Sequence, residues 1–295
     1  MGKVSYRLKG HESFVPREGW ITKGLRAAKE DPTIISSNYA ADVMGVGTNM
    51  AKSIRFWLRT AGLTRDVQKV GTVLTPLGTL VLDHDPYLEK DFTLWILHAN
   101  IVRNFAQATT WNVFFNDFDL NSWKRDEMCQ LMEEYIIERT GDTALSSRSI
   151  KDDCNAILAM YTAEDAETSD PEESKRSPFT SLGLIKKTGS YYTRCSRSYS
   201  QVGMYPVLYM IANDLNHDGF LSIDHILSAD NMPGKVFFMN RIQLNNALDA
   251  LASAGFITVN RTAGLDMVYP VAEISSEEAV SVFYSNNCAD GDYII

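Results

Sequence analysis

The stretch over residues 39–63 constrains the fold of this chain most, because it predicts two helices joined by a glycine turn. A short run of small and apolar residues ends at Gly45 and Gly47, which mark the turn. Thr48 then suits the N-cap of a second helix. Apolar residues recur along that helix at helical spacing, so we expect one face to pack inward: Met50, Ile54, Trp57 and Leu58.

The opposite face of the second helix is polar and basic, and no acidic residue lies between Val43 and Arg65. In a chain of formal net charge −9, this local reversal of sign indicates contact with a polyanion. A helix-turn-helix unit places its second helix in the major groove, where Asn and Arg contact bases and Lys contacts phosphates. We therefore expect DNA contact from Asn49, Lys52, Arg55 and Arg59. The alternative is a helical hairpin whose basic face is only solvated.

The composition is that of a folded protein, with 295 residues of which 45% are hydrophobic and 11% aromatic. No run of about 18 apolar residues predicts a membrane span, and no apolar region predicts a signal peptide. The four cysteines have neither zinc-binding nor evident disulfide spacing, so we expect a cytoplasmic protein. Acidic segments at 163–173 and 272–295 carry much of the negative charge. This balance argues against non-specific coating of nucleic acid but not against specific binding.

We expect a mainly α fold in which winged-helix-like units with small β-hairpin wings flank a helical bundle. The periodicity of apolar residues and the positions of turn-forming residues divide the chain into four parts. They are an N-terminal segment with a DNA-binding unit (1–84), a helical bundle (85–162), an acidic linker with a basic, aromatic loop (163–200), and a C-terminal winged-helix-like domain (201–295).

Several elements within this division are predicted from periodicity and from caps. The helices are expected at about 25–32, 85–108, 122–139, 147–162, 205–212, 222–228 and 240–254, and the hairpins at 70–82 and 255–270. The long second helix of this series is expected to start at Asp85, because Asp suits a helix cap and the following Pro suits the first turn.

Two clusters of polar residues suggest hydrolytic chemistry. A histidine near the N-terminus could act as a general base beside an arginine that stabilises a phosphorane, and paired carboxylates could hold a divalent metal. The alternatives are a buried polar network, a helix cap at Asp85 and a buried histidine at position 98. The candidate catalytic residues are His11, Glu12, Arg17, Asp85, Glu89 and His98.

Residues 214–222 resemble the first nine positions of an EF-hand loop, with Gly219 at the sixth. His225 stands at the twelfth position, where a bidentate Glu belongs. We therefore interpret this segment as a polar turn between helices.

Further candidate DNA contacts lie in the second half of the chain. Cations alternate with tyrosines between Ile185 and Ser200, a pattern that suits single-stranded nucleic acid, although a solvated basic loop has the same pattern. The C-terminal helix and hairpin add polar residues at outward positions, and such units also serve as protein–protein modules. These candidates are Lys186, Lys187, Arg194, Arg197, Arg241, Asn245 and Arg261.

Three ordered motifs in the first 118 residues resemble an SspB-like bacterial family, formerly of unknown function. Its members open with HETF-x-x-R-x-x-W-x-x-K-G, continue with LGVGKNM, and then carry a DPYLED-like helix start followed by W-x-x-H. The matching positions here are His11, Glu12, Phe14, Arg17, Trp20, Lys23, Gly24, Gly45, Val46, Gly47, Asn49, Met50, Asp85, Pro86, Leu88, Glu89, Trp95 and His98. Departures include Ser13 for Thr, Met44 for Leu, and Thr48 for Lys, which removes one cation.

The resemblance implies a role in bacterial DNA phosphorothioation and anti-phage defence. Genes of this family sit beside a cysteine desulfurase, an ATPase and an ATP-pyrophosphatase-like protein, which are therefore the expected partners besides DNA. The implied activity is DNA nicking that opens one strand for sulfur incorporation, with Mg²⁺ or Mn²⁺ as the expected cofactor. Two alternatives stay open: a non-catalytic adaptor that recruits the modification proteins, and a winged-helix transcriptional regulator.

Overall fold

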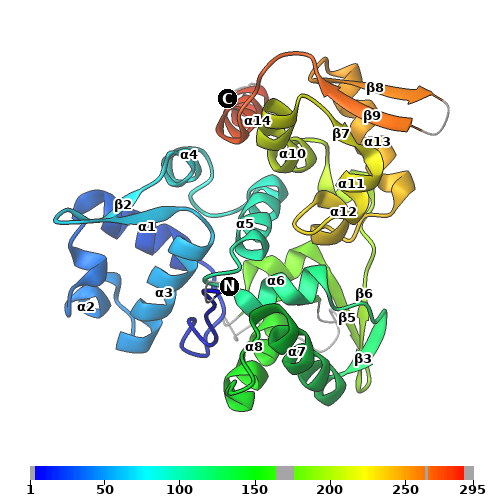
Figure 1. Ribbon diagram of the computed structural model, residues 1–295. Helices are drawn as coiled ribbons and strands as arrows, with labels where there is room; N and C mark the ends of the chain where they lie inside the picture. The colour runs from blue at the N-terminus through cyan, green and yellow to red at the C-terminus, as the bar shows by residue number, and fades with distance from the viewer. Residues whose placement is uncertain (1–3, 164–175, 263–264, 289–295) are drawn as a thin grey trace. The chain divides into compact units, whose positions relative to one another are not determined.

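The computed structural model describes residues 4–163, 176–262 and 265–288, and it is mainly helical, as predicted (Figure 1). The chain forms two compact units: Met1–Lys90 with Leu97–Cys195, and Asp91–Ile96 with Ser196–Ile295. Within the described ranges, no helix is both long enough and apolar enough to cross a bilayer. Most of the predicted acidic linker, residues 164–175, lies outside the described residues.

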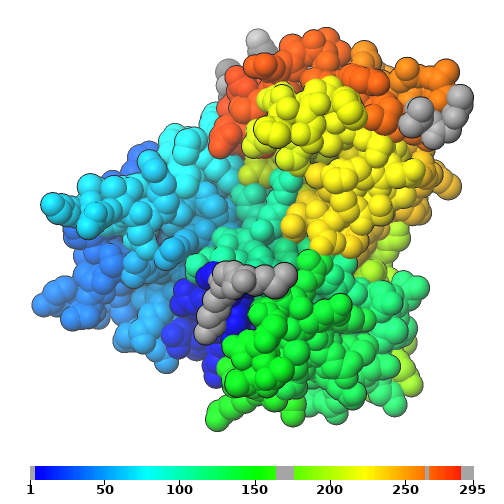
Figure 2. Space-filling view, viewed as in Figure 1, coloured from blue at the N-terminus to red at the C-terminus, as the bar shows by residue number. Residues whose placement is uncertain are grey.

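The N-terminal part of the first unit contains four helices, one 3₁₀ turn and a two-stranded hairpin. In chain order they are α1 (Trp20–Glu30), η1 (Ile34–Ser36), α2 (Ala40–Met44), α3 (Thr48–Thr60), β1 (Thr64–Val67), β2 (Gly71–Leu74) and α4 (Pro76–His84). The antiparallel β1–β2 hairpin, cyan in Figure 2, projects at the left edge of this unit in the view shown.

The predicted pair of helices joined by a glycine turn is confirmed. Gly45 ends α2 at φ 63°, a left-handed conformation that glycine adopts without strain. The N-cap of α3 is Gly47 rather than Thr48, which is the first helical residue, and no side chain caps the helix. Ile54, Trp57 and Leu58 are each at most 1% exposed, so burying this face contributes roughly 2 kcal/mol per side chain.

The hairpin predicted over 70–82 is only partly correct, because its second half is the helix α4. Thr75 caps that helix by accepting the backbone N–H of Gly78, and Pro76 occupies the first turn. Gly78 is therefore no turn glycine. A Cβ there would lie 2.0 Å from the carbonyl oxygen of Leu63, so the helix packs closely because the side chain is missing.

The bounds of the long helix predicted over 85–108 are wrong, because the helix in this range, α5 (Asp91–Arg103), begins later and ends earlier, and a separate helix, α6 (Thr109–Asn116), follows it. Asp85 stands before a proline, which disfavours helical backbone, and its φ is −150°. Its carboxylate accepts the backbone N–H groups of Glu89 at 2.8 Å and Lys90 at 3.2 Å. The Asp-Pro pair thus closes a turn between α4 and α5 instead of starting a helix.

The rest of the first unit combines helices with a small mixed sheet. It contains α6 together with β3 (Ser122–Lys124), α7 (Arg125–Thr140), α8 (Ser147–Tyr161), β4 (Thr162–Ala163), η2 (Pro178–Leu182), β5 (Ile185–Thr188) and β6 (Tyr191–Arg194). The strand order is β3-β6-β5-β4, with β4 parallel to β5 and the other pairs antiparallel. The segment predicted as a basic, aromatic loop is thus the β5–β6 hairpin.

The second unit follows the predicted order of helices and a hairpin. It comprises the start of α5 with α9 (Tyr199–Val202), α10 (Tyr205–Asp218), β7 (Leu221–Ser222), α11 (Ile223–Ser228), α12 (Pro233–Val236), α13 (Arg241–Ser253), β8 (Ile257–Thr262), β9 (Leu265–Pro270) and α14 (Ser276–Cys288). The short strand β7 was not predicted, and it completes an antiparallel sheet of order β7-β9-β8.

Candidate functional site

The N-terminal end of the basic helix α3 faces solvent. Asn49 and Lys52 are both exposed, and Lys52 Nζ lies 3.5 Å from Asn49 Oδ1. Because these residues follow the Gly45–Gly47 turn, their side chains stand at the start of the helix, where a major-groove helix makes base contacts.

Farther along α3, two arginines share one carboxylate. Arg55 Nη2 and Arg59 Nη1 donate to Asp66 Oδ2 at 3.0 and 3.2 Å, and Thr72 donates to Asp66 Oδ1 at 2.8 Å. Partial burial opposes ionisation of this carboxyl, but the Thr72 hydrogen bond and the two guanidinium charges hold the pKa of Asp66 below its ordinary value. The side chains of Arg55 and Arg59 stay 39% and 48% exposed, so the contact orients them without burying them.

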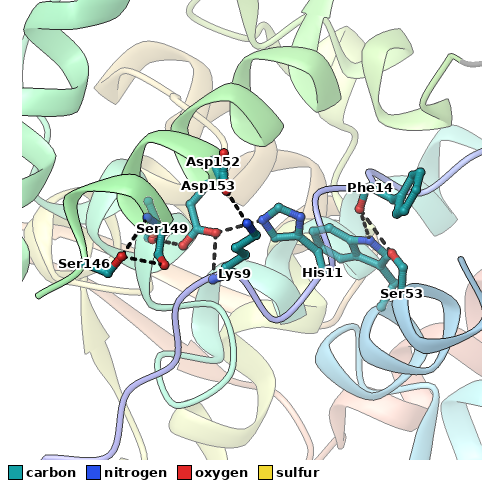
Figure 3. Close-up of polar contacts among 10 residues, drawn as sticks. Lys9, His11, Phe14, Ser53, Ser146, Ser149, Asp152 and Asp153 are labelled. Carbon is teal, nitrogen blue, oxygen red and sulfur yellow. Dashed lines mark hydrogen bonds and ion pairs between the residues drawn. The ribbon is translucent and has the colours of Figure 1, made fainter. Parts of the chain in front are cut away.

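His11 lies in a fully buried polar network with Asp153 of α8 (Figure 3). Its Nε2 is 2.8 Å from Asp153 Oδ1, which also accepts the backbone N–H of Lys9 at 2.9 Å. Thr110 donates to the other carboxylate oxygen at 2.6 Å. Asp153 therefore ties the N-terminal loop to α6 and α8.

Aromatic rings enclose the same histidine. The ring of His11 stacks on Trp57 at 5.9 Å between centroids and meets Trp111 edge-on at 5.5 Å. Its Nδ1 has no hydrogen-bond partner among the described residues. Trp57 also donates to the carbonyl of Phe14 at 2.9 Å, so the loop is anchored to α3 on its other side.

The loop around His11 is conformationally strained. Lys9, Glu12 and Ser13 have φ values of 56°, 50° and 66°, in the left-handed region that non-glycine residues seldom occupy. Such strain costs of order 1 kcal/mol per residue and persists only where surrounding contacts determine the backbone. Here the buried His11–Asp153 network supplies those contacts, and the result is that Glu12 and Ser13 face solvent.

The other predicted catalytic residues occupy different environments. Arg17 lies over the rings of Phe14 and Trp20, at 5.5 and 5.3 Å. Asp85 is buried in the turn before α5, whereas Glu89 in the same turn is exposed.

His98 is fully buried within α5, and its Nδ1 is 2.9 Å from the hydroxyl of Tyr161. Burial raises the pKa of that tyrosine well above its ordinary value. In the described ranges, no three His, Cys, Asp or Glu side chains converge in a group that could hold a metal ion. The predicted catalytic set therefore forms no preformed metal site. The polar turn predicted over 214–222 is only partly correct, because residues 214–218 are the end of α10 and only Gly219, at φ 77°, begins the turn to β7. Asn216 of α10 bonds to the backbone of Ile274.

The predicted contacts around the β5–β6 hairpin separate into exposed and buried residues. Lys186 and Lys187 are exposed on β5. Arg194 is largely buried and donates to the carbonyl of Phe118, and burial lowers the pKa of its guanidinium. Arg197 belongs to the second unit, where its backbone N–H donates to Phe238.

Two of the predicted cations in the second unit, Arg241 and Arg261, are paired with acids. Arg241, at the start of α13, contacts Asp224 and Asp266, the latter at 3.3 Å. Arg261 of β8 pairs with Asp249 of α13 at 2.8 Å. Asn245 is half-buried on α13.

Three residues with a part in these contacts were not predicted from the sequence: Asp66, Lys124 and Asp153. Asp153 could have been found, because it falls three residues after Ile150 on the apolar face of α8 that also carries Ile157. A carboxylate at a core position needs a partner, which is the signal of a buried network.

A sequence profile described as protein of unknown function (DUF4007) matches residues 8–284. Two solved structures are similar in fold. A magnesium ion-bound SspB crystal structure superposes with a TM-score of 0.81 at 22% identity, covering 98% of this chain and 90% of the other. An SspB crystal structure gives 0.82 at 22% identity, covering 98% and 89%. Among curated proteins, no sequence matches.

Proposed function

The chain belongs to the DUF4007 family, and we propose that it is the DNA-binding, strand-nicking protein of a DNA phosphorothioation system. The observation that carries the DNA-binding part is the outward basic face of α3. Asn49 and Lys52 are exposed at its start. Arg55 and Arg59 lie farther along it, where they pair with Asp66 but stay accessible to solvent. A polyanion can reach all four side chains.

We interpret α1–β2 and α10–β9 as two winged-helix units. Support comes from the order of elements, in which three α-helices precede the β1–β2 hairpin and four, one of them the four-residue α12, precede the β8–β9 hairpin. In α10–β9, the strand β7 lies between α10 and α11 and pairs with the hairpin, in the order β7-β9-β8. On this interpretation α3 and α13 are the helices that enter a groove, with Arg241 and Asn245 on α13 and Arg261 on its wing.

Strand nicking is the second part of the proposal, and it rests on the motifs around His11 and Glu12. Glu12 is the charged residue of that motif that both faces solvent and sits on strained backbone. A non-catalytic adaptor is a second candidate, because His11 and His98 are 0% exposed and a general base has to reach its proton. In both cases the partners would be a cysteine desulfurase, an ATPase and an ATP-pyrophosphatase-like protein.

Mg²⁺ or Mn²⁺ is the cofactor proposed for nicking, since either ion could activate water and stabilise charge on a phosphate. The candidate acids and histidines do not fit a preformed site, because they form no cluster of three in the part of the chain that the structure describes.

Duplex binding tests the first part. A Lys52→Glu variant should bind a labelled duplex about tenfold more weakly in fluorescence anisotropy, with a salt slope smaller by about one. Lys151→Glu, an equal charge change at an exposed position on α8, is the control and should bind as the wild type does. Equal affinities for wild type and Lys52→Glu would reject α3 as the contact.

Conversion of supercoiled plasmid to open circles tests the second part. The purified full chain should nick in Mg²⁺ and not in EDTA. Tight DNA binding with no nicking, either alone or with the proposed partner proteins, would favour the adaptor.

A further inference from the structure

The sheet formed by β3, β6 and β5 has one inward and one outward face. Paired residues share a face, and the row containing Trp123 and the row containing Ile185 are inward, since both of these side chains are fully buried. The alternate rows form the outward face, which consists of Ser122, Lys124, Lys186, Thr188, Tyr191 and Thr193.

The outward face presents one aromatic ring among cations. Tyr191 is 47% exposed, and Lys124 Nζ lies 5.2 Å from its ring centroid. Lys186 is exposed opposite Thr193, in the row of the outward face next to the row that contains Tyr191. None of the six residues is acidic, in a chain whose net charge is −9.

We propose that this outward face binds single-stranded DNA, with a base stacked on Tyr191 and the flanking phosphates on Lys124 and Lys186. Exposed aromatic rings interleaved with cations bind single strands because every unpaired base offers a π-face. A duplex lacks this opportunity, since neighbouring base pairs cover both faces of each base. The inference rests on the proposed function, in which a nicked strand has to be held open while sulfur is incorporated.

Tertiary structure changes the predicted set of contacts here. Arg194 points into the unit and Arg197 belongs to the other one, so neither is part of the outward face. Lys124 replaces them, although it lies 67 positions before Tyr191 in the sequence. The β3–β6 pairing brings these two residues together.

The test measures binding of the full chain to a fluorescein-labelled oligothymidine of about 15 nucleotides and to a duplex of the same length. Tyr191→Ala should weaken single-strand binding about tenfold and leave duplex binding unchanged. Tyr191→Phe should bind as the wild type, because the ring is kept. The control is Tyr87→Ala, which removes an exposed tyrosine that also has a cation partner, Arg26 at 5.8 Å.

Lys124→Gln and Lys186→Gln should each reduce the salt slope for the single strand by about 0.7. Circular dichroism checks that each variant is folded. No single-strand binding by the wild type, equal binding by Tyr191→Ala and Tyr87→Ala, or an equal loss on both DNAs would each overturn the inference. If Lys52→Glu binds duplex DNA as tightly as the wild type does, the proposed function itself is rejected, so the two failures are distinguishable.

Discussion

Oδ2 of Asp66 lies 3.0 Å from Nη2 of Arg55, which links the β1–β2 hairpin to the basic face of α3. The same oxygen accepts from Arg59, so one carboxylate offsets part of the charge of two cations. The second unit repeats the relationship, with Asp266 of β9 holding Arg241 at the start of α13. In both units an acid on the hairpin orients an arginine on the preceding helix and lowers the local positive potential.

Removing the charge of Asp66 should strengthen DNA binding. We expect Asp66→Asn to bind duplex DNA severalfold more tightly and with a steeper salt dependence, because Arg55 and Arg59 lose their intramolecular anion. Stability should fall by no more than about 1 kcal/mol, since exposed ion pairs contribute little. Anisotropy titrations at several salt concentrations measure the first effect, and urea unfolding the second.

Asp83→Asn is the matched control for this experiment. Asp83 pairs with Lys29 at 3.2 Å, both side chains are exposed, and neither lies on α3. If both Asn variants raise DNA affinity equally, net charge explains the result and the specific role of Asp66 is rejected.

The buried Asp153 network should contribute strongly to stability. Asp153→Ala leaves His11, Thr110 and the backbone N–H of Lys9 without their acceptor, and we expect the free energy of unfolding to fall by about 3 kcal/mol. The neighbouring Asp152→Ala removes a partly exposed carboxylate paired with Lys9 and should cost less than about 1 kcal/mol. Similar losses for the two variants in urea unfolding would contradict a central role for the network.

Glu12 is expected to matter for nicking but not for folding. Glu12→Gln keeps the size and hydrogen-bonding shape of an exposed side chain, so the unfolding midpoint should not move, whereas plasmid nicking should fall at least a hundredfold. Glu18→Gln, also exposed and on the same loop, should keep full activity. Wild-type activity in Glu12→Gln would remove this residue from the catalytic candidates.

A cysteine pair between α7 and α8 should make stability depend on pH. Cys154 donates a hydrogen bond to Cys129, and this bond lowers the pKa of Cys129 from 9.0 to about 7, while burial opposes the change. The same bond, together with burial, raises the pKa of Cys154. A thiol whose pKa is lower in the folded state adds stability above its unfolded pKa and loses it as the pH falls through the folded value.

Unfolding free energies between about pH 7 and pH 9 test this prediction. The contribution of Cys129 should be fully present above pH 9 and should decrease as the pH falls towards 7. The difference between wild type and Cys129→Ser should therefore grow with pH. Cys195→Ser, at a half-buried cysteine outside this pair, is the control, and a difference that does not change with pH would contradict the assignment.

Helical periodicity in the sequence was sufficient to place α2, α3, α8 and α13, because each buries an apolar face formed by residues three and four positions apart. It was also sufficient to predict which side of α3 is basic. The predictions were wrong at two proline-containing segments. Thr75-Pro76 begins a helix, whereas Asp85-Pro86 ends one, since the same residue types suit a cap and a turn.

The pairing of distant residues could not be predicted from local pattern. Asp153 meets His11 across 142 positions, and Lys124 meets Tyr191 only because β3 joins β6. Contacts between residues that are distant in the sequence depend on how the helices and strands pack, and this packing sets the burial and the electrostatic environment of each side chain. Packing therefore made His11 a buried anchor, left Glu12 exposed, and set Asp66 against the arginines of α3, whereas the helical faces themselves followed from the order of apolar and polar residues.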